Sequence, residues 1–284
     1  MAPTETKFYK KFFPFLPNQI PVPTIVPKNM HWPPCIITIE GHSNWVQTVT
    51  ISADGQFVIS GSDDKTVKIW DIQTGALQRT LEGHSESVKA VAISTDGKFV
   101  VSGSLDETVK IWDAQTGALQ RTLEGHNGRV FAVAISTDGH FIVSGSSDQT
   151  VKIWNTQTGA LQTILVGHSD EVSAIAISRD GQLIVSGSKD KAVKIWDVQT
   201  GALQRTLEGH SSWVSAVAIS TDGQLIVSGS NDRIVKIWDA QTGALQKKLE
   251  GHHGSVNAVA ISADGQFVVS GSFDKTVKIW DAQT

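Results

Sequence analysis

A quartet of histidine, serine, aspartate and tryptophan recurs at constant spacing along this chain. In its second occurrence the residues are His84, Ser102, Asp106 and Trp112. Serine, histidine and aspartate are the residue types of a hydrolytic triad, in which the imidazole takes the proton of the serine hydroxyl. Neither a nucleophile-elbow motif nor an oxyanion-hole motif accompanies them, and six equivalent catalytic centres would serve no purpose. We therefore expect that the chain is not an enzyme.

A structural role explains the quartet better. The aspartate carboxylate and the histidine ring can pair, the ring can bond the serine hydroxyl, and the hydroxyl can accept the indole N–H. Buried polar groups need such partners, and an unpaired one costs about 1–3 kcal/mol. The expected structural tetrads are His42, Ser60, Asp64, Trp70; His84, Ser102, Asp106, Trp112; His126, Ser144, Asp148, Trp154; His168, Ser186, Asp190, Trp196; His210, Ser228, Asp232, Trp238; and His252, Ser270, Asp274, Trp280.

The quartet belongs to a unit of 42 residues that occurs six times without insertion or deletion. Repeats of this length each form one supersecondary unit that stacks on its neighbours. Within residues 83–124, apolar β-branched runs alternate with the turn signals Asp96-Gly97 and Thr116-Gly117. No segment has the 3.6-residue apolar period of a helix. We predict four short antiparallel strands, at about 88–93, 99–104, 108–112 and 119–123, which make one blade of a β-propeller.

The Gly-His and Trp-Asp signature, with its Asp-Gly turn, resembles the WD-repeat β-propeller family across residues 35–284. This resemblance implies an all-β, six-bladed propeller with four antiparallel strands in each blade, and it implies that the quartet forms a structural tetrad. Trp154-Asn155 departs from Trp-Asp and is not expected to disturb its tetrad.

The near identity of the units also resembles the WD-repeat arrays of fungal NACHT-type (STAND) incompatibility receptors. In those receptors the array is a recognition module attached to a nucleotide-binding domain. No GxxxxGK[ST] phosphate loop occurs in this sequence. The chain is therefore either a free-standing propeller or a fragment of such a receptor.

The two ends of the repeat array match each other. The last repeat stops after its third strand, and Ile36–Glu40 has the sequence pattern of the fourth strand Gln78–Glu82. We expect residues 35–40 to complete the last blade and close the ring, which removes two exposed sheet edges. Units this similar can also pair between chains. We expect a monomer, with a domain-swapped oligomer as the alternative.

Residues 1–34 differ from the repeats in composition. All eight prolines lie there, and proline removes the backbone donor that a sheet needs. We expect a poorly ordered N-terminal extension. The alternative is that its aromatic residues, such as Phe8 and Phe12, pack on the propeller or bind a partner.

Composition excludes several classes of function. The net charge is −4 and no basic stripe is present, which argues against nucleic-acid binding. Cys35 is the single cysteine, so a disulfide framework and a cysteine zinc site are excluded. The repeated histidines lie on different blades, and we expect neither a metal nor a cofactor. No apolar run is long enough to span a bilayer. We expect a cytoplasmic protein, with the nucleus as the alternative.

The copies differ mainly in two places, after each Gly-His and around each tetrad aspartate. In an up-and-down blade both places lie at one end, so they converge on one rim of the ring, which we call the variable rim. The changes are radical, from Asp63 to Leu105 to Lys189 to Phe273. The predicted binding positions are Trp45, Gln47, Asp63, Lys65, Glu86, Ser87, Lys89, Leu105, Glu107, Arg129, Phe131, Ser147, Gln149, Asp170, Glu171, Ser173, Lys189, Lys191, Trp213, Ser215, Asn231, Arg233, Ser255, Asn257, Phe273 and Lys275.

Aromatic and arginine side chains are the usual hot spots of interfaces. We therefore predict a recognition platform for a protein or peptide, with Trp45, Phe131, Trp213 and Phe273 as anchors and with Lys89, Arg129, Glu171, Lys189 and Arg233 setting the charge preference. Two alternatives remain open. One is a lectin-like propeller with similar sugar pockets in every blade, and the other is a constitutive scaffold whose rim variation has no role.

Overall fold

The structure is a computed structural model that describes residues 37–283. The chain divides into two units, Met1–Thr38 and Ile39–Thr284, and the description below concerns the second. The expectations for residues 1–34 and for residues 35–36 lie outside the described residues.

The described residues form 23 β-strands in six antiparallel sheets. The first sheet contains β1 (Val46–Ile51), β2 (Phe57–Ser62), β3 (Val67–Asp71) and β4 (Leu77–Leu81). The second contains β5 (Val88–Ile93), β6 (Phe99–Ser104), β7 (Val109–Asp113) and β8 (Leu119–Leu123). The third contains β9 (Val130–Ile135), β10 (Phe141–Ser146), β11 (Thr150–Asn155) and β12 (Leu161–Val166). The fourth contains β13 (Val172–Ile177), β14 (Leu183–Ser188), β15 (Val193–Asp197) and β16 (Leu203–Leu207). The fifth contains β17 (Val214–Ile219), β18 (Leu225–Ser230), β19 (Val235–Asp239) and β20 (Leu245–Leu249), and the sixth contains β21 (Val256–Ile261), β22 (Phe267–Ser272) and β23 (Val277–Asp281).

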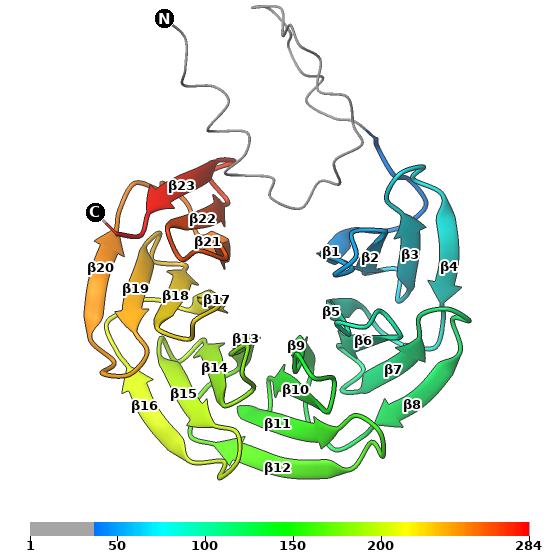
Figure 1. Ribbon diagram of the computed structural model, residues 1–284, viewed down its shortest axis with the longest axis horizontal. Coiled ribbons are helices and arrows are strands. Elements are labelled where there is room, and N and C mark those ends of the chain that lie inside the picture. The colour runs from blue at the N-terminus through cyan, green and yellow to red at the C-terminus, as the bar shows by residue number, and fades with distance from the viewer. Residues whose placement is uncertain (1–36, 284) are drawn as a thin grey trace, which may run out of the picture. The chain divides into compact units, whose positions relative to one another are not determined.

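Each sheet is an up-and-down meander in chain order, and the six sheets follow one another along an arc (Figure 1). The first strand of every sheet lies innermost, and the fourth strand of each four-stranded sheet lies at the outer edge (Figure 1). The prediction of an all-β propeller built from four-stranded antiparallel sheets is confirmed. That six sheets make up the whole propeller remains a prediction.

Local sequence explains the hairpins. In the second sheet Asp96 accepts hydrogen bonds from Ser94 Oγ at 2.7 Å and from the backbone N–H of Lys98 at 3.1 Å. Gly97 follows with φ of +69°, a left-handed conformation in which other residues are strained. The same Asp-Gly turn recurs in every unit, so one short sequence sets the register of each first hairpin.

The core lies between neighbouring sheets. In the first junction Ile59 and Leu81 of one sheet are buried against Val88 and Val100 of the next. Gly103 shows how close this approach is, because a Cβ built on it would lie 2.7 Å from the Cγ1 atom of Val130 in the following sheet. Five such apolar clusters join the six sheets.

The ends of the arc differ from the sequence-based expectation. The sixth sheet has three strands, and residues 37–40 form no strand. Among the described residues, nothing completes the last sheet as a fourth strand, and the first and last sheets lie at the two ends of an open arc (Figure 1). The sequence match between Ile36–Glu40 and Gln78–Glu82 predicts what could pair, but pairing also requires the curvature of the arc to bring the two ends together.

Candidate recognition rim

The six quartets form six hydrogen-bonded chains. In the second sheet Trp112 Nε1–H donates to Ser102 Oγ at 2.8 Å, Ser102 Oγ lies 2.7 Å from His84 Nε2, and His84 Nδ1 lies 2.7 Å from Asp106. The other five repeat these contacts within 0.1 Å. Asn155 leaves this geometry unchanged and accepts from Thr158 in its own turn, as Asp71 does from Thr74.

The tetrads hold their carboxylates in the ionised state. Burial raises the pKa of Asp190, but hydrogen bonds from His168 and from the backbone of Ala192 outweigh it and hold the pKa at about 2. The pKa of Asp232 is also about 2, because hydrogen bonding and the charge of His210 outweigh burial. Each serine oxygen is already engaged by an indole and an imidazole, and Ser102 is fully buried. The tetrads therefore offer no accessible nucleophile, and their geometry serves the interior of each sheet.

The variable residues lie elsewhere, in two stretches that meet in every sheet. The backbone N–H of the residue before each tetrad aspartate donates to the carbonyl of a residue after Gly-His, as Asp63 does to Trp45 at 2.9 Å and Lys189 does to Glu171 at 2.9 Å. The remaining pairs are Leu105 with Ser87, Ser147 with Arg129, Asn231 with Trp213, and Phe273 with Ser255. The variable rim is therefore one continuous end of the arc.

Two backbone irregularities coincide with variable positions. The first strand of every sheet has a register shift that leaves one residue unpaired with the second strand, namely Gln47, Lys89, Phe131, Ser173, Ser215 and Asn257. Such a bulge changes the direction of a side chain and is over-represented beside functional sites. Sequence reasoning identified these residues as variable but did not predict the bulges, because only the pairing register reveals them.

The second irregularity is a left-handed backbone at the residue after each tetrad aspartate. Six residues other than glycine have φ between 67° and 73°, namely Lys65, Glu107, Gln149, Lys191, Arg233 and Lys275. A side chain in this conformation costs roughly 1–2 kcal/mol. Glycine would avoid the cost, yet every unit retains a long polar side chain here. The sequence gave no signal for this conformation, since no glycine marks it.

Several predicted binding residues are occupied by one another. Lys89 Nζ lies 2.7 Å from Asp63 of the preceding sheet, and Gln47 Nε2 donates to the same carboxylate at 2.6 Å. The hydrogen bond from Lys89 lowers the pKa of Asp63. Lys65 lies 3.6 Å from Glu86 of the next sheet. These pairs tie the first sheet to the second, so Lys89 is less free to meet a partner than its sequence position suggests.

A second cluster spans the third, fourth and fifth sheets. Lys189 Nζ lies 2.6 Å from Glu171, 4.5 Å from the centre of the Trp213 ring and 5.9 Å from that of Phe131. The structure thus brings four predicted binding residues together from three sheets. It also corrects the expectation that Glu171 and Lys189 set charge preference freely, because their charges already neutralise each other.

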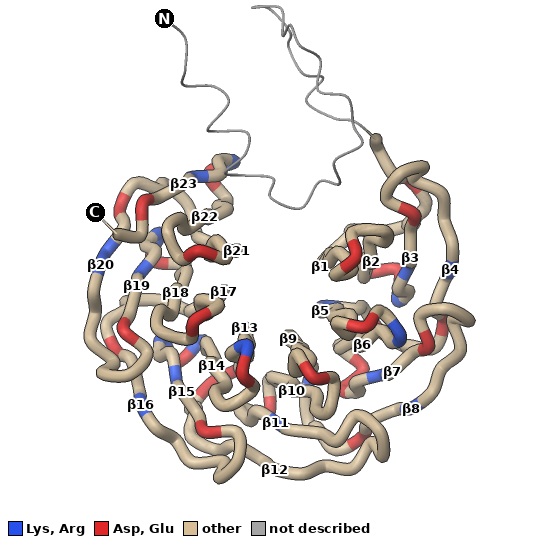
Figure 2. The backbone as a smooth tube through the Cα atoms, viewed as in Figure 1, with Lys and Arg blue, Asp and Glu red and all other residues tan. Residues whose placement is uncertain are grey.

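Other rim charges have no such partner. Within residues 37–283, no ion pair is formed by Arg129, Lys191, Arg233 or Lys275. Trp45 and Phe273 are the most exposed aromatic side chains of the rim and lie in the first and last sheets. Elsewhere, acidic positions recur in every sheet and basic positions are interspersed among them (Figure 2).

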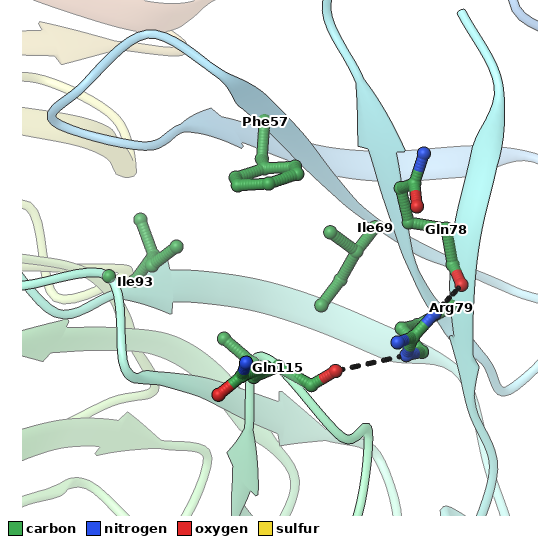
Figure 3. Close-up of a pocket in the computed structure, with 8 residues that line it drawn as sticks. Phe57, Ile69, Gln78, Arg79, Ile93 and Gln115 are labelled. Carbon is green, nitrogen blue, oxygen red and sulfur yellow. Dashed lines mark hydrogen bonds between the residues drawn. The ribbon is translucent and has the colours of Figure 1, made fainter.

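Pockets occur at the end opposite the variable rim. One of about 340 Å³ lies between the first and second sheets, where Phe57, Ile69 and Ile93 form its apolar wall (Figure 3). Arg79 crosses this junction and donates to the carbonyl of Gln115 at 3.1 Å (Figure 3). A related pocket between the next two sheets is lined by the equivalent Phe99 and Arg121. Sequence reasoning assigned no role to this constant end.

The part of the chain that the structure describes contains no helix suited to crossing a bilayer. Within the same residues, no cluster of three histidine, cysteine, aspartate or glutamate side chains has the arrangement of a metal site.

Two family models match the chain. The model described as the TEP-1 second β-propeller matches residues 97–284, and the model described as WD domain, G-beta repeat, matches residues 33–71 and 75–113. The resemblance that the Gly-His and Trp-Asp signature indicates is thereby confirmed.

Curated relatives match shorter stretches. The vegetative incompatibility protein HET-E-1 of Podospora anserina is 50% identical over 74 residues, which is 26% of this chain and 5% of that protein. The nuclear distribution protein PAC1 of Candida tropicalis is 39% identical over 66 residues, which is 22% of this chain and 13% of that protein. The ribosome biogenesis protein BOP1 homolog of Drosophila grimshawi is 48% identical over 44 residues, which is 16% and 6% of the two chains. The matched stretches thus cover only a small part of the length of these relatives.

Proposed function

Since the chain belongs to the WD-repeat β-propeller family, we propose that it is a non-catalytic recognition module that binds a protein or peptide on the variable rim. The observation that carries this proposal is the coincidence of sequence variation with special backbone geometry. Radical differences between otherwise near-identical units fall on bulged residues such as Phe131 and on left-handed residues such as Arg233. Strained or bulged positions that retain large side chains are typical of functional surfaces.

The free charges of the rim suggest the chemistry of the partner. Lys89, Lys189 and Glu171 are neutralised within the rim, which leaves Arg129 and Arg233 as unpaired guanidinium groups. Trp213 lies between them along the chain and remains 47% exposed. We propose a partner segment that combines acidic side chains with an apolar or aromatic anchor, because arginine and tryptophan are the residues that most often dominate such interfaces.

The name of one relative supports a recognition role. HET-E-1 is described as a vegetative incompatibility protein, and the WD-repeat arrays of such receptors act as recognition modules. Whether this chain is a free-standing propeller or part of such a receptor is a separate proposal, which the present residues leave open.

A comparative capture experiment tests the proposal. The wild-type chain, a rim variant (Trp213→Ala with Arg233→Ala) and an opposite-end variant (Gln115→Ala with Gln199→Ala) are used as baits in parallel. A partner that the wild type and the opposite-end variant retain equally, and that the rim variant loses, supports rim recognition. If the rim variant retains every protein that the wild type binds, the rim variation is incidental and the constitutive-scaffold alternative is correct.

The equivalent pockets at the constant end favour a second candidate, the lectin-like propeller. Their apolar floor of Phe57 or Phe99 and their flanking arginine recur from one junction to the next, as repeated binding of one ligand requires. Aromatic rings at such positions can stack on sugars. A glycan array probed with the wild type and with Phe99→Ala tests this candidate, and an absence of glycan binding would dismiss it.

A further inference from the structure

The two ends of the arc expose apolar side chains that every internal sheet buries. Val277 and Ile279 on β23 are 71% and 66% exposed, whereas the equivalent residues on β3, β7, β11, β15 and β19 are at most 3% exposed. On β1, Val49 is 65% exposed, whereas its equivalent Val91 is 8% exposed. The outer face of the sixth sheet thus lacks a following sheet, and the outer face of the first lacks a preceding one.

These two faces are the halves of one interface that the chain builds five times. At each internal junction a valine of the following sheet covers a glycine of the preceding one, at 2.7 Å from the position of a Cβ. The equivalent glycine of the sixth sheet, Gly271, has nothing closer than Ala258 at 3.8 Å, in its own sheet. Val46, the equivalent of the covering valines, is 51% exposed. Glycine and valine are therefore already matched for one more junction.

The rim aromatics fit the same junction. Lys189, which precedes the tetrad aspartate of the fourth sheet, contacts Trp213, which stands in the loop before the fifth sheet, at 4.5 Å from its ring centre. Phe273 occupies the position of Lys189 in the sixth sheet, and Trp45 occupies the position of Trp213 before the first. Both aromatic side chains are exposed, at 75% and 77%. A sixth junction would place them against each other as an aromatic pair.

We propose that the last sheet of one copy of this chain docks on the first sheet of a second copy. A second copy fits because this contact repeats the five existing junctions and leaves each of them unchanged. Joining both ends within one chain would instead require the whole arc to tighten (Figure 1), and close-packed interiors resist such changes at every junction.

The incoming copy also brings backbone for the incomplete sheet. Inside the arc, each fourth strand runs directly into the Gly-His that precedes the next sheet, as β4 runs into Gly83. The segment before Gly41 stands in the same relation to the first sheet. It would lie along β23 of the neighbouring copy and add a fourth strand there, since an exposed strand edge accepts such a strand through its main chain.

The contact is heterologous, because it joins two different faces. It therefore leaves one face free on each outer copy and can continue beyond two chains, to a closed assembly or an open filament.

Directional cross-linking tests the proposal in the full-length chain. In a Cys35→Ser background, which removes the single cysteine, Trp45→Cys and Phe273→Cys are made separately, with one variant carrying a tag that alters its mass. A short bismaleimide is added to the mixture. The mixed product should exceed the statistical share severalfold over either product of two identical variants.

Equal amounts of the three products, or none, would overturn the proposal. So would rapid cross-linking within a single chain of the Trp45→Cys, Phe273→Cys double variant, because that result would mean closure of one ring. Light scattering provides the second arm. The wild-type mass should rise with concentration above that of one chain, Val277→Lys should return it to one chain, and Val166→Lys, which changes an equally exposed valine on β12, should not. A constant mass of one chain for the wild type would contradict the proposal.

Discussion

Lys152 places its ammonium group 3.2 Å from the carboxylate of Asp148, inside the tetrad of the third sheet. Its equivalents Lys68, Lys110 and Lys194 instead donate to a threonine hydroxyl on the neighbouring fourth strand, at 2.9–3.0 Å. In the third sheet this threonine is replaced by Ile164, which offers no acceptor. A single substitution on an outer strand thus changes the electrostatics of a buried tetrad.

The pKa of His126 should report this change. Burial lowers the pKa of His126, hydrogen bonding and the charge of Asp148 oppose that effect, and the nearby Lys152 adds to it. Ile164→Thr restores the acceptor and should draw Lys152 away, so the pKa of His126 should rise. An NMR titration of the imidazole measures it, with Lys152→Met as a positive control. An unchanged pKa in both variants would contradict the assigned role of Lys152.

Loss of one tetrad serine should destabilise the whole propeller. Ser102→Ala leaves the buried Trp112 N–H and the His84 ring without their partner, which costs about 1–3 kcal/mol. At this chain length the melting temperature should fall by roughly 2–4 °C for each kcal/mol. Ser85→Ala, which changes an exposed serine in the adjoining loop, is the matched control. Equal melting temperatures for the two variants would refute the tetrad as a stabilising network.

The left-handed rim residues should be stabilised by glycine. Glu107→Gly relieves the backbone at φ of 70°, whereas Glu107→Ala removes the same side chain and keeps the strain. We expect the glycine variant to be more stable than the alanine variant by about 1 kcal/mol, measured by urea unfolding. The comparison isolates the backbone, because neither variant retains the carboxylate. A glycine variant that is no more stable than the alanine variant would remove backbone strain from the description of the rim.

Stability should fall in acid through the tetrad carboxylates. The pKa of Asp190 and of Asp232 is about 2 in the folded chain, below the value of about 3.9 for an unfolded aspartate. The unfolded chain therefore takes up protons first as the pH falls. The stabilisation is complete above about pH 4 and is lost as the pH falls towards about 2. Urea midpoints between pH 7 and pH 2 measure the loss, and Asp190→Asn should flatten the curve.

Much of this fold could be predicted because the chain repeats itself. Six aligned copies separate the residues that build a sheet from those that vary, which places the strands, the turns and three members of each tetrad. The serine was harder, since Ser102 and Ser104 are both buried and the same residue type. Only geometry distinguishes Ser102, which bonds the indole, from Ser104, which donates to the carbonyl of Glu86.

What sequence could not supply depends on three-dimensional registration. The bulge at Lys89 appears only when two strands are paired, and the left-handed backbone at Glu107 carries no glycine to mark it. Whether Lys89 is free or bound depends on Asp63 of a neighbouring sheet. The expected closing strand illustrates the same limit, because a matching sequence does not fix the distance between the ends of the arc.

The most direct test of rim recognition is the affinity of a captured partner for single alanine variants. Trp213→Ala should weaken binding by about 2 kcal/mol or more, roughly 30-fold in the dissociation constant. Its melting temperature should stay near that of the wild type, since the ring is half-exposed. Gln115→Ala, at the opposite end, should change the dissociation constant less than twofold. Undiminished affinity of the Trp213→Ala variant, together with a loss on Gln115→Ala, would contradict a binding surface on the variable rim.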